Sequence, residues 1–356
     1  MLAARWWGRK DVRVENIDDP GEPRDGWVRV RVEACGICGT DMEEYRLGPV
    51  LVPVTPHPLT HRCAPLTLGH EAVGIVEAAG PGVTLEVGTR VAIETNLSCG
   101  TCWWCLQGEI PLCPKLASLG LMGDGGLAEV ILAPAAMCAA FATDVRPERA
   151  ALAEPLSVVV RAIRKAGVEP GSTVGVIGAG TVGLLTVQVA RLAGARSILV
   201  VEPIERRREL ALALGADAAV APEDAAAAAL ELTGGRGLDI TLEAGGNPAA
   251  AQAAVRLARK GGRTVLLGVF DAPLGIDMMD LLLGEKHVLG SLSHVFSTDF
   301  VPAVQLIDDD KIELDALITD RIALADVVQD GFLALADEPE EHLKIVVFPN
   351  GLPVGA

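Results

Sequence analysis

Short segments in which apolar residues alternate with polar or small ones dominate the first 95 residues of the chain. The clearest are 12–15, 27–32 and 73–76. A two-residue period places successive side chains on opposite faces, so these segments predict half-buried β-strands. Between Gly48 and Leu68 prolines interrupt the pattern, and we expect a long ordered loop there. This part of the chain is therefore predicted to be β-rich.

From about residue 147 the pattern changes to longer apolar stretches of helical period, beginning with a helix expected over 150–166. Short buried strands then alternate with helices as far as His294. The expected strands are 173–177, 198–202, 218–220, 239–242, 264–267 and 288–290, and the expected helices include one that ends near 193, 225–232 and 249–259. Strands that alternate with helices in this way predict an α/β fold with a doubly wound parallel sheet.

The length of the chain and its final segment complete the prediction of domains. A chain of 356 residues exceeds what one ordinary core accommodates and suggests two domains. After His294 the chain leaves the parallel sheet, and its last apolar strand is expected at 343–347. We therefore expect residues 1–157 and 295–356 to form one β-rich domain and residues 158–294 to form the α/β domain.

The turn after the first strand of the α/β domain carries three spaced glycines. The sequence Gly178-Ala-Gly180-Thr181-Val182-Gly183 leads directly into an apolar helix. The first glycine allows a tight turn, the second lets the backbone approach a pyrophosphate, and the third lets the helix pack closely on the strand. The free N–H groups of the helix N-terminus would then face the diphosphate. The α/β domain is therefore predicted to bind a dinucleotide.

An acidic residue at the end of the second strand bears on which dinucleotide is bound. Glu202 lies 19 residues after Gly183, where a carboxylate that binds the adenosine ribose hydroxyls is expected. The arginines at 206–208, with Arg207 at their centre, could instead accept the 2′-phosphate of NADP. Because the carboxylate of Glu202 would repel that phosphate, we predict NAD as the cofactor and NADP as the less favoured alternative.

Four of the eight cysteines fall close together. They are Cys99, Cys102, Cys105 and Cys113. Two Cys-x2-Cys steps followed by a fourth cysteine can surround one tetrahedral ion within a single loop, although an incidental cluster of cysteines is the alternative. Since thiolates would fill all four positions, we predict a closed, structural zinc site here.

A second candidate metal site is scattered along the chain. Cys38 lies in the segment Cys35-Gly-Ile-Cys38-Gly-Thr-Asp, His70 precedes Glu71, and Glu154 follows much later. A thiolate, an imidazole and a carboxylate are the ligands of a catalytic zinc that keeps one position open. Three alternatives remain at this point, namely that Cys38 is a buried thiol, that His70 is a core histidine, or that Cys35 and Cys38 form a redox pair. Only the fold can bring these groups together.

Composition limits the partners. Lys and Arg number 30 against 47 Asp and Glu, which gives a net charge of −17. This balance argues against binding to nucleic acid or to an anionic membrane surface. The N-terminal residues lack the apolar core of a signal peptide, and no apolar run approaches the roughly 18 residues of a membrane-spanning helix. We therefore expect a soluble, cytoplasmic protein.

The chain carries both the glycine-rich turn and the segment 99–113 with its four cysteines, called the four-cysteine lobe below. It therefore resembles the zinc-dependent medium-chain dehydrogenase/reductase family, and the resemblance extends from residues 3–6 to residues 344–345. The segment 57–71 looks most like the 2,3-butanediol and polyol dehydrogenase branch. The resemblance implies a GroES-like catalytic domain beside a Rossmann domain. It implies a catalytic zinc on Cys38, His70 and Glu154, with Glu71 as an alternative ligand or a supporting partner, and a structural zinc on Cys99, Cys102, Cys105 and Cys113.

The resemblance also implies a reaction. Thr40 matches the family hydroxyl that takes the proton of the alcohol substrate, but Glu43 stands where members commonly carry histidine, which leaves the proton relay open. We expect NAD-dependent interconversion of a secondary alcohol, vicinal diol or polyol and its ketone. A threonine-type dehydrogenase, a metal-free reductase and a non-catalytic nucleotide-binding protein are the alternatives. Apolar residues at 288–292 suggest pairing between subunits, in a homodimer or homotetramer.

Overall fold

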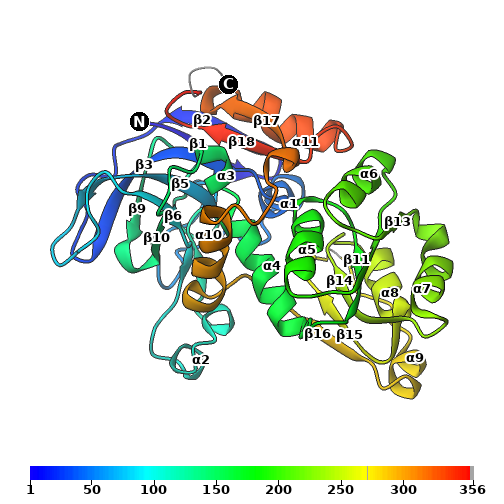
Figure 1. Cartoon of the computed structure of the whole chain (residues 1–356). Helices are drawn as coiled ribbons and strands as arrows, with labels where there is room; N and C mark the ends of the chain where they lie inside the picture. Colours follow the sequence, from blue (N-terminus) through cyan, green and yellow to red (C-terminus); the bar gives the residue numbers. More distant parts are fainter. Residues whose placement is uncertain (271, 353–356) are drawn as a thin grey trace. The chain divides into compact units, whose positions relative to one another are not determined.

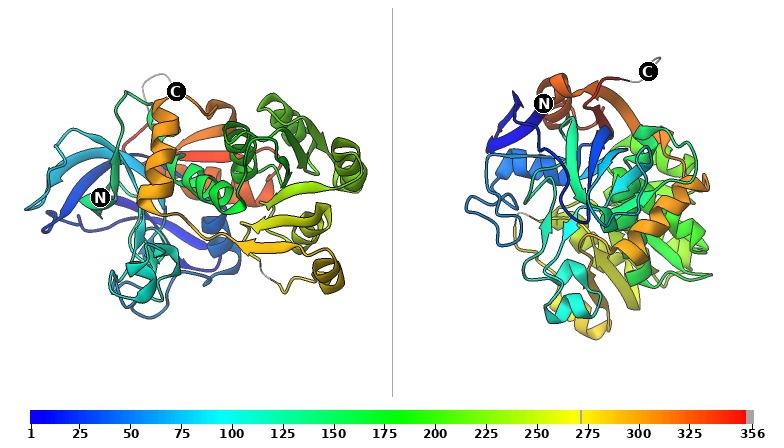
Figure 2. Two further views of the ribbon diagram at one scale, coloured as in Figure 1. Left: turned by 60° about the horizontal axis from the view of Figure 1, so that its bottom comes forward. Right: turned by 90° about the vertical axis from the view of Figure 1, so that its left-hand side faces the viewer.

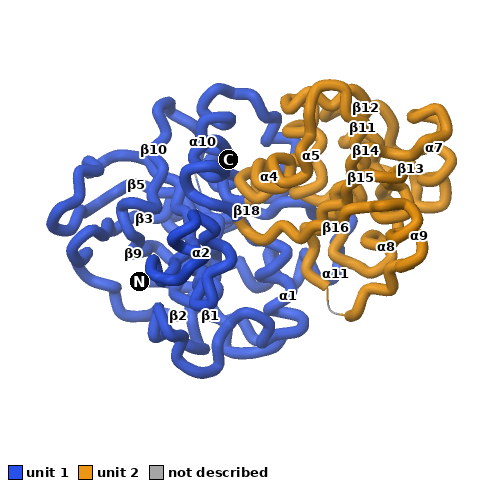
Figure 3. The backbone as a smooth tube through the Cα atoms, turned by 90° about the horizontal axis from the view of Figure 1, so that it is seen from below, with its two compact units in different colours: residues 1–154, 294–356 blue, residues 155–293 orange. Residues whose placement is uncertain are grey.

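The structure is a computed structural model that describes residues 1–270 and 272–352. The chain forms two compact units, which Figure 3 shows in different colours. Unit 1 comprises residues 1–154 and 294–356, and unit 2 comprises residues 155–293. The chain therefore leaves unit 1 after Glu154 and re-enters it at His294, close to the boundaries expected from the sequence. Residues 353–356, at the end of the expected β-rich domain, lie outside the described residues.

Unit 1 is built from β-sheets (Figure 1). Its largest sheet has seven strands in the order β10-β6-β5-β3-β18-β17, with β9 also paired to β3. These strands are β3 (Trp27–Gly36), β5 (Glu71–Ala79), β6 (Arg90–Ile93), β9 (Val130–Pro134), β10 (Cys138–Ala140), β17 (Ile318–Ala323) and β18 (Lys344–Phe348). The smaller sheets comprise β1 (Leu2–Gly8), β2 (Asp11–Asn16) and β4 (Leu66–Thr67), and β7 (Asn96–Leu97) with β8 (Ala117–Ser118).

The strand β3 shows why the alternating pattern folds as it does. Val28, Val30 and Val32 are fully buried and pack in the core of unit 1. Between them Arg29 points outward and pairs with Asp19, with a nitrogen–oxygen distance of 2.5 Å. One face of the strand is thus buried and the other charged, which fixes the register of the pairing because a slip of one residue would bury arginine.

The last strand of the chain lies inside the large sheet rather than at its edge. β18 pairs antiparallel with β3 and parallel with β17. All five of its residues are buried, including Lys344, which is 3% exposed. Figure 2 shows this red strand beside blue strands from the start of the chain. The sequence predicted the strand, and the structure places it so that its side chains reach the interior of unit 1.

The helical elements of unit 1 are short. They include α1 (Gly39–Leu47), α2 (Trp103–Leu106), α3 (Pro147–Ala150), α10 (Val301–Asp308), α11 (Ala334–Asp337), η4 (Phe296–Phe300) and η7 (Val327–Leu333). In Figures 1 and 2, α10 lies beside β10 and α3. The proline-rich segment 48–65 is irregular, as predicted, and the buried carboxylate of Glu44 accepts hydrogen bonds from its backbone at Val50 and Val52. Among the described residues no helix has the length and hydrophobicity needed to cross a membrane.

Unit 2 is the predicted doubly wound α/β structure. Its six strands pair in parallel in the order β13-β12-β11-β14-β15-β16. They are β11 (Thr173–Ile177), β12 (Ser197–Val201), β13 (Ala218–Val220), β14 (Leu238–Glu243), β15 (Ala258–Leu266) and β16 (His287–Gly290). The order reverses between β11 and β14, and ligands of such sheets bind beyond the carboxyl ends of the strands at this point.

The helices of unit 2 follow the prediction with two differences at their ends. They are α4 (Ala153–Ala166), which begins at the unit boundary, α5 (Thr181–Leu192), α6 (Glu205–Ala213), α7 (Ala225–Thr233), α8 (Pro248–Leu257) and α9 (Met278–Leu283). The helix expected from residue 150 begins at Ala153, because the separate turn α3 precedes it. β15 begins at Ala258 rather than at 264, since the polar, glycine-rich run 259–263 lacks the apolar character by which a strand is recognised.

Candidate functional site

The first turn of α1 positions Cys38. This residue is the N-cap of the helix and has an extended backbone conformation. Its backbone N–H donates to Oδ2 of Asp41 at 2.9 Å. A side chain that accepts from the cap residue in this way fixes the start of a helix. The Cys38 thiol is therefore held at a defined point beside the end of β3.

His70 lies next to this thiol. It is 5% exposed, and its Nδ1 lies 3.5 Å from Oδ1 of Asp41, which is fully buried. Burial acts to lower the pKa of His70, but the charges of Asp41 and Cys38 outweigh it and raise the pKa well above its usual value. Asp41 thus supports both the start of α1 and the orientation of His70, as carboxylates commonly do for a histidine that binds metal.

Cys38, His70 and Glu71 form a compact group. Each offers one ligand atom, and these atoms lie within 4.8 Å of one another. Burial raises the pKa of the Cys38 thiol. Ligands at about 2.0–2.3 Å from a tetrahedral zinc are separated by less than about 4 Å, so small side-chain adjustments would let the group hold zinc. His70 and Glu71 are buried and Cys38 is half-buried, so the group combines a thiol, an imidazole and a carboxylate at one point of the interior.

Glu71 has a partner of its own. Lys344 Nζ donates to both carboxylate oxygens, at 2.8 and 2.6 Å, and to the carbonyl oxygen of Ile37 at 3.0 Å. Both charged groups are almost completely buried. Burial acts to lower the pKa of Lys344, but Glu71 outweighs it and raises the pKa. A Cβ at Gly36 would lie 1.9 Å from Glu71 Oε2, so the glycine gives this carboxylate its space.

The structure places Glu154 outside this compact group. It is 8% exposed, and its Oε1 lies 3.5 Å from Nδ1 of His294. Burial raises the pKa of Glu154, although the charges of His294 and His70 act to lower it. His70 is thus close enough to influence this carboxylate. The two glutamates predicted as ligands differ, because Glu71 is bound to a lysine and Glu154 faces a histidine.

The two predicted proton-transfer residues lie on α1. Thr40 is half-buried and is the second residue of the helix, directly after Gly39. Glu43 lies three residues further on and is also half-buried. Residues three apart share one face of a helix, so both belong to the same face of α1.

The four-cysteine lobe gathers its thiols as predicted. Cys105 Sγ lies 3.9 Å from Cys99 Sγ and 3.4 Å from Cys102 Sγ, and Cys113 belongs to the same group. Thiolates on a tetrahedral zinc lie about 3.8 Å apart, so the spacing fits the ion. The backbone N–H groups of Cys102 and Cys105 donate to Cys99 Sγ and Cys102 Sγ at 3.3 and 3.4 Å. Such bonds favour the thiolate form that zinc requires.

The glycine-rich turn of unit 2 has the geometry of a phosphate cradle. Gly178 has a φ of +98°, and a Cβ at Gly183 would lie 2.0 Å from Gly178 O, so both positions require glycine. At Gly180 a Cβ would meet nothing within 4 Å, which leaves open space above the backbone. Gly180 is the N-cap of α5, which begins at Thr181, and the N-terminal end of a helix favours an anion.

Glu202 lies against this turn. One oxygen of its buried carboxylate accepts from the backbone of Ala179 at 2.6 Å, and the other accepts from that of Ile204 at 3.0 Å. Arg208 donates to the carbonyl oxygen of Glu202 at 2.9 Å, and Arg207 is half-buried on α6. The structure therefore brings the predicted ribose-binding acid to the predicted phosphate turn.

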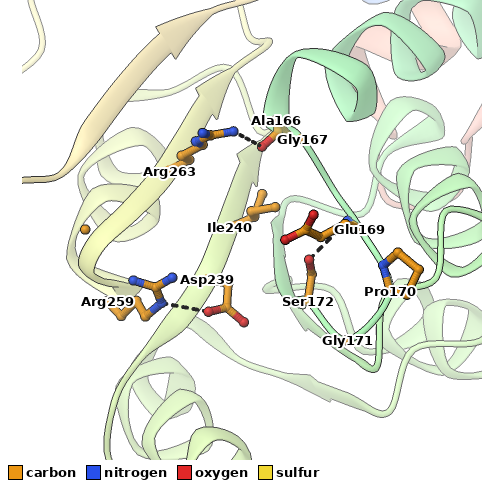
Figure 4. Close-up of a pocket in the computed structure, with 11 residues that line it drawn as sticks. Ala166, Gly167, Glu169, Pro170, Gly171, Ser172, Asp239, Ile240, Arg259 and Arg263 are labelled. Carbon is orange, nitrogen blue, oxygen red and sulfur yellow. Dashed lines mark hydrogen bonds and ion pairs between the residues drawn. The ribbon is translucent and has the colours of Figure 1, made fainter.

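A polar pocket of about 580 Å³ lies elsewhere in unit 2. It is lined by residues at the amino ends of β11 and β14, including Ser172 and Asp239. Figure 4 shows Arg259 directed at Asp239, with a nitrogen–oxygen distance of 2.6 Å, and Arg263 directed at the carbonyl oxygen of Ala166, at 3.3 Å. The glycine-rich turn follows the carboxyl end of β11, so this pocket is not the nucleotide site.

Three residues close to the candidate metal ligands were not singled out from the sequence. Asp41 could have been found, because an acid three residues after an N-cap is a capping signal. Lys344 and His294 carry no such signal. In the sequence Lys344 is part of an apolar strand with no sign of a special role. Only the placement of β18 in the large sheet brings it to Glu71.

Comparisons with known proteins identify the class of this fold and site. Residues 24–143 match the model of the alcohol dehydrogenase GroES-like domain, and residues 181–309 match that of the zinc-binding dehydrogenases. The (R,R)-butanediol dehydrogenase of Bacillus subtilis (strain 168) is 35% identical over 98% of this chain and 100% of its own length. The crystal structure of 2R,3R-butanediol dehydrogenase from Bacillus subtilis superposes with a TM-score of 0.90, at 34% identity over 98% of this chain and 99% of that one.

Two further solved structures hold a cofactor. The short-chain alcohol dehydrogenase of E. coli CFT073, complexed with NADH, is 26% identical over 98% of this chain and 99% of its own, with a TM-score of 0.86. A protein of Sinorhizobium meliloti 1021 assigned as a zinc-binding dehydrogenase, bound to NADP, is 34% identical over the same shares, with a TM-score of 0.85. The chain belongs to the zinc-dependent medium-chain alcohol dehydrogenase family. It is an oxidoreductase that uses zinc and NAD(P), as the sequence predicted.

Proposed function

We propose that the chain interconverts a vicinal diol, or another secondary alcohol, and the corresponding ketone with NAD as the hydride acceptor. The observation that carries the proposal is the close approach of Cys38 and His70, with the buried carboxylates of Glu71 beside them and Glu154 nearby. The similarity to (R,R)-butanediol dehydrogenase along almost the whole chain supports the choice of a diol. A neighbouring hydroxyl would give such a substrate a second point of attachment.

Cys38, His70 and Glu154 are the residues that would hold the catalytic zinc. Glu71 is the weaker candidate, because Lys344 already binds both of its oxygens. When bound, zinc supplies a Lewis acid that lowers the pKa of the substrate hydroxyl. Asp41 keeps His70 in place for this task. The four clustered cysteines, Cys99, Cys102, Cys105 and Cys113, would hold the structural zinc.

Thr40 is the residue that would accept the substrate proton. It lies two residues after Cys38, in the first turn of α1, and is half-buried. A hydroxyl can accept one proton while it donates its own to a neighbour, so Thr40 can pass a proton on. Glu43, one turn further along the same face, is a candidate for the next step of that transfer.

The turn from Gly178 to Gly183 would bind the pyrophosphate of NAD. The open space above Gly180 and the backbone N–H groups of Thr181 and Val182 favour an anion there. When bound, NAD accepts hydride from the substrate carbon. The Glu202 carboxylate would bind the ribose hydroxyls and repel a 2′-phosphate, while Arg208 is occupied by backbone carbonyl groups. Arg207 is the residue through which NADP could still be accepted.

The reaction can be tested directly. Formation of reduced cofactor would be followed at 340 nm with NAD or NADP and a panel of vicinal diols, polyols, simple secondary alcohols and threonine. We expect the highest kcat/KM with a diol and NAD, and loss of this activity after a chelator removes accessible zinc. Threonine as the best substrate would contradict the diol assignment, and turnover that survives loss of zinc would contradict the metal role.

The role of Thr40 is tested by two substitutions. Thr40→Ala removes the hydroxyl and should lower kcat by about 10²–10⁴-fold, the usual contribution of a positioned proton acceptor. Thr40→Ser keeps the hydroxyl and should retain most of kcat. Both variants should bind zinc as the wild type does. Equal activities for the two variants would show that the hydroxyl takes no part in proton transfer.

We also propose that two copies of the chain pair through unit 2. β16 is an edge strand of the parallel sheet, and its unpaired backbone groups could extend that sheet into a second subunit. The neighbouring helix α9 exposes several apolar side chains, namely Met278, Met279, Leu282 and Leu283. Sedimentation should give a particle of at least twice 37.1 kDa. Particles of single-chain mass alone would remove this proposal.

A further inference from the structure

A buried histidine stands between two buried glutamates in unit 1. His294 is fully buried, and its Nε2 lies 3.3 Å from Oε1 of Glu94 while its Nδ1 lies 3.5 Å from Oε1 of Glu154. Glu94 is 3% exposed and Glu154 is 8% exposed. Each ring nitrogen thus lies near a different carboxylate, although neither makes a hydrogen bond of good geometry to it. An arrangement of three buried polar side chains is costly unless the groups satisfy one another.

The surrounding backbone holds the histidine in place. The side-chain amide of Asn96 donates to the carbonyl oxygen of His294 at 3.2 Å, and the backbone N–H of Asn96 donates to Oε1 of Glu94 at 3.2 Å. On the other side Asp299 Oδ2 accepts from the backbone N–H of Val295 at 2.8 Å. These hydrogen bonds fix the backbone on both sides of the imidazole, and its Nδ1 stays within 3.5 Å of Glu154.

The position of the pair along the chain gives it a second significance. Glu154 is the last residue of unit 1 before the chain enters unit 2, and His294 is the first residue after it returns. The two residues at which the chain crosses between units are thus in contact with each other. A displacement at either crossing would reach the Glu154 carboxylate through this contact.

We infer that His294 is a positioning residue for Glu154. Its Nδ1 lies 3.5 Å from one carboxylate oxygen, and the buried imidazole so limits the orientations in which Glu154 can be offered to zinc. The inference rests on the proposed function, which makes Glu154 a ligand. Partners that orient a metal ligand typically contribute about 10–100-fold to metal affinity, because the ligand otherwise loses rotamer freedom when it binds.

Two conservative substitutions of His294 test the contacts of Nδ1 and of Nε2 separately. The amide nitrogen of asparagine takes the place of Nδ1, and that of glutamine takes the place of Nε2. His294→Asn therefore keeps an N–H group on the Glu154 side of the site, and His294→Gln keeps one only on the Glu94 side. We expect His294→Gln to weaken zinc binding about tenfold or more, whereas His294→Asn stays close to the wild type. If the effect were only structural, both variants would lose affinity and thermal stability together.

The accessible zinc is first removed from the protein, and the zinc of the four-cysteine site is retained as the internal control. The measurement is then a competition between the protein and a chelator for added zinc. The loss caused by His294→Gln should disappear when Glu154→Gln is already present, because the two residues act as a unit. Equal affinities for the two His294 variants, or a loss that persists beside Glu154→Gln, would overturn the inference. A wild type that takes up no second zinc would overturn the proposed metal site itself, and the inference with it.

Discussion

The two candidate zinc sites of unit 1 differ both in their ligands and in their surroundings. The four-cysteine lobe draws all its ligands from residues 99–113, at the surface, and surrounds its thiols with backbone N–H groups. The Cys38 group draws its members from separate segments of the chain, and its two buried members lie beside buried charged side chains, Asp41 at His70 and Lys344 at Glu71. A single loop can supply all the ligands of a metal site. A site whose ligands come from distant segments also needs a partner for each charge that the fold buries.

From this comparison we expect substitution of Cys38 to have the largest effect on activity. Cys38→Ser removes a thiolate from the open site, and kcat/KM should fall by roughly a thousandfold or more, because the Lewis acid contributes several kcal/mol to the reaction. Zinc content should fall from two ions per chain to one, with the circular dichroism spectrum unchanged. A variant that keeps both ions and its activity would show that Cys38 is not a ligand.

The balance of buried charge is tested by Lys344→Met. This change leaves Glu71 buried without its cation, and the free energy of unfolding should fall by about 3–5 kcal/mol. Urea denaturation would measure the loss. Adding Glu71→Gln to the same chain removes the stranded charge and should restore much of the stability. If the double variant is no more stable than Lys344→Met, the ion pair is not what the lysine contributes.

The local character of the lobe predicts a milder outcome for Cys102→Ser. The variant should lose the lobe zinc and about 1–3 kcal/mol of stability, within the range of ordinary substitutions. Its kcat/KM at room temperature should remain near that of the wild type, since no ligand of the open site changes. Residues 99–113 should become sensitive to limited proteolysis. A loss of activity as deep as that of Cys38→Ser would show that the two sites are coupled.

The smallest expected effect concerns thiol reactivity in the metal-free protein. Hydrogen bonds from Thr101 and Cys102 lower the pKa of Cys99 to about 6, whereas burial raises the pKa of Cys38 above its usual value. At pH 7 Cys99 is therefore mostly thiolate and should react with iodoacetamide at least about tenfold faster than Cys38. Its rate should decline as the pH falls through about 6. Peptide mass mapping at several pH values would measure both rates, and similar rates at pH 7 would contradict this difference.

The sequence predicted those features that depend on local pattern. These features are the alternation of apolar and polar residues in strands, the spacing of Gly178, Gly180 and Gly183, and the spacing of the cysteines. Each of them is defined by residues that lie close together in the sequence. The α/β fold and the family assignment follow from these patterns and are confirmed. The one systematic error lay at ends such as the start of β15, where a glycine-rich run joins a strand through its backbone pairing alone.

The charged surroundings of the open site could not be predicted in this way. Lys344 follows Glu71 by 273 positions, and nothing in either segment indicates the other. His294 likewise has no local signal, because its partners come from two other segments. For the same reason the sequence left Glu71 and Glu154 as rival ligands. The choice between them depends on which cation each carboxylate meets, and that is decided by tertiary structure.

The central place of β18 has a consequence for how the chain is made. Unit 2 is one continuous segment, so all its strands are available once residue 293 has been synthesised. The large sheet of unit 1 has to wait, because Lys344 bonds to Ile37 across 307 positions. β9 pairs with the first half of β3, but until β18 emerges the end of β3 at Cys35 and Gly36 lacks its partner, and such an edge is a place where growing chains can associate wrongly. The arrival of β18 pairs this end and delivers the lysine for Glu71 in the same step, so Glu71 gains its cation only after residue 344 has been synthesised.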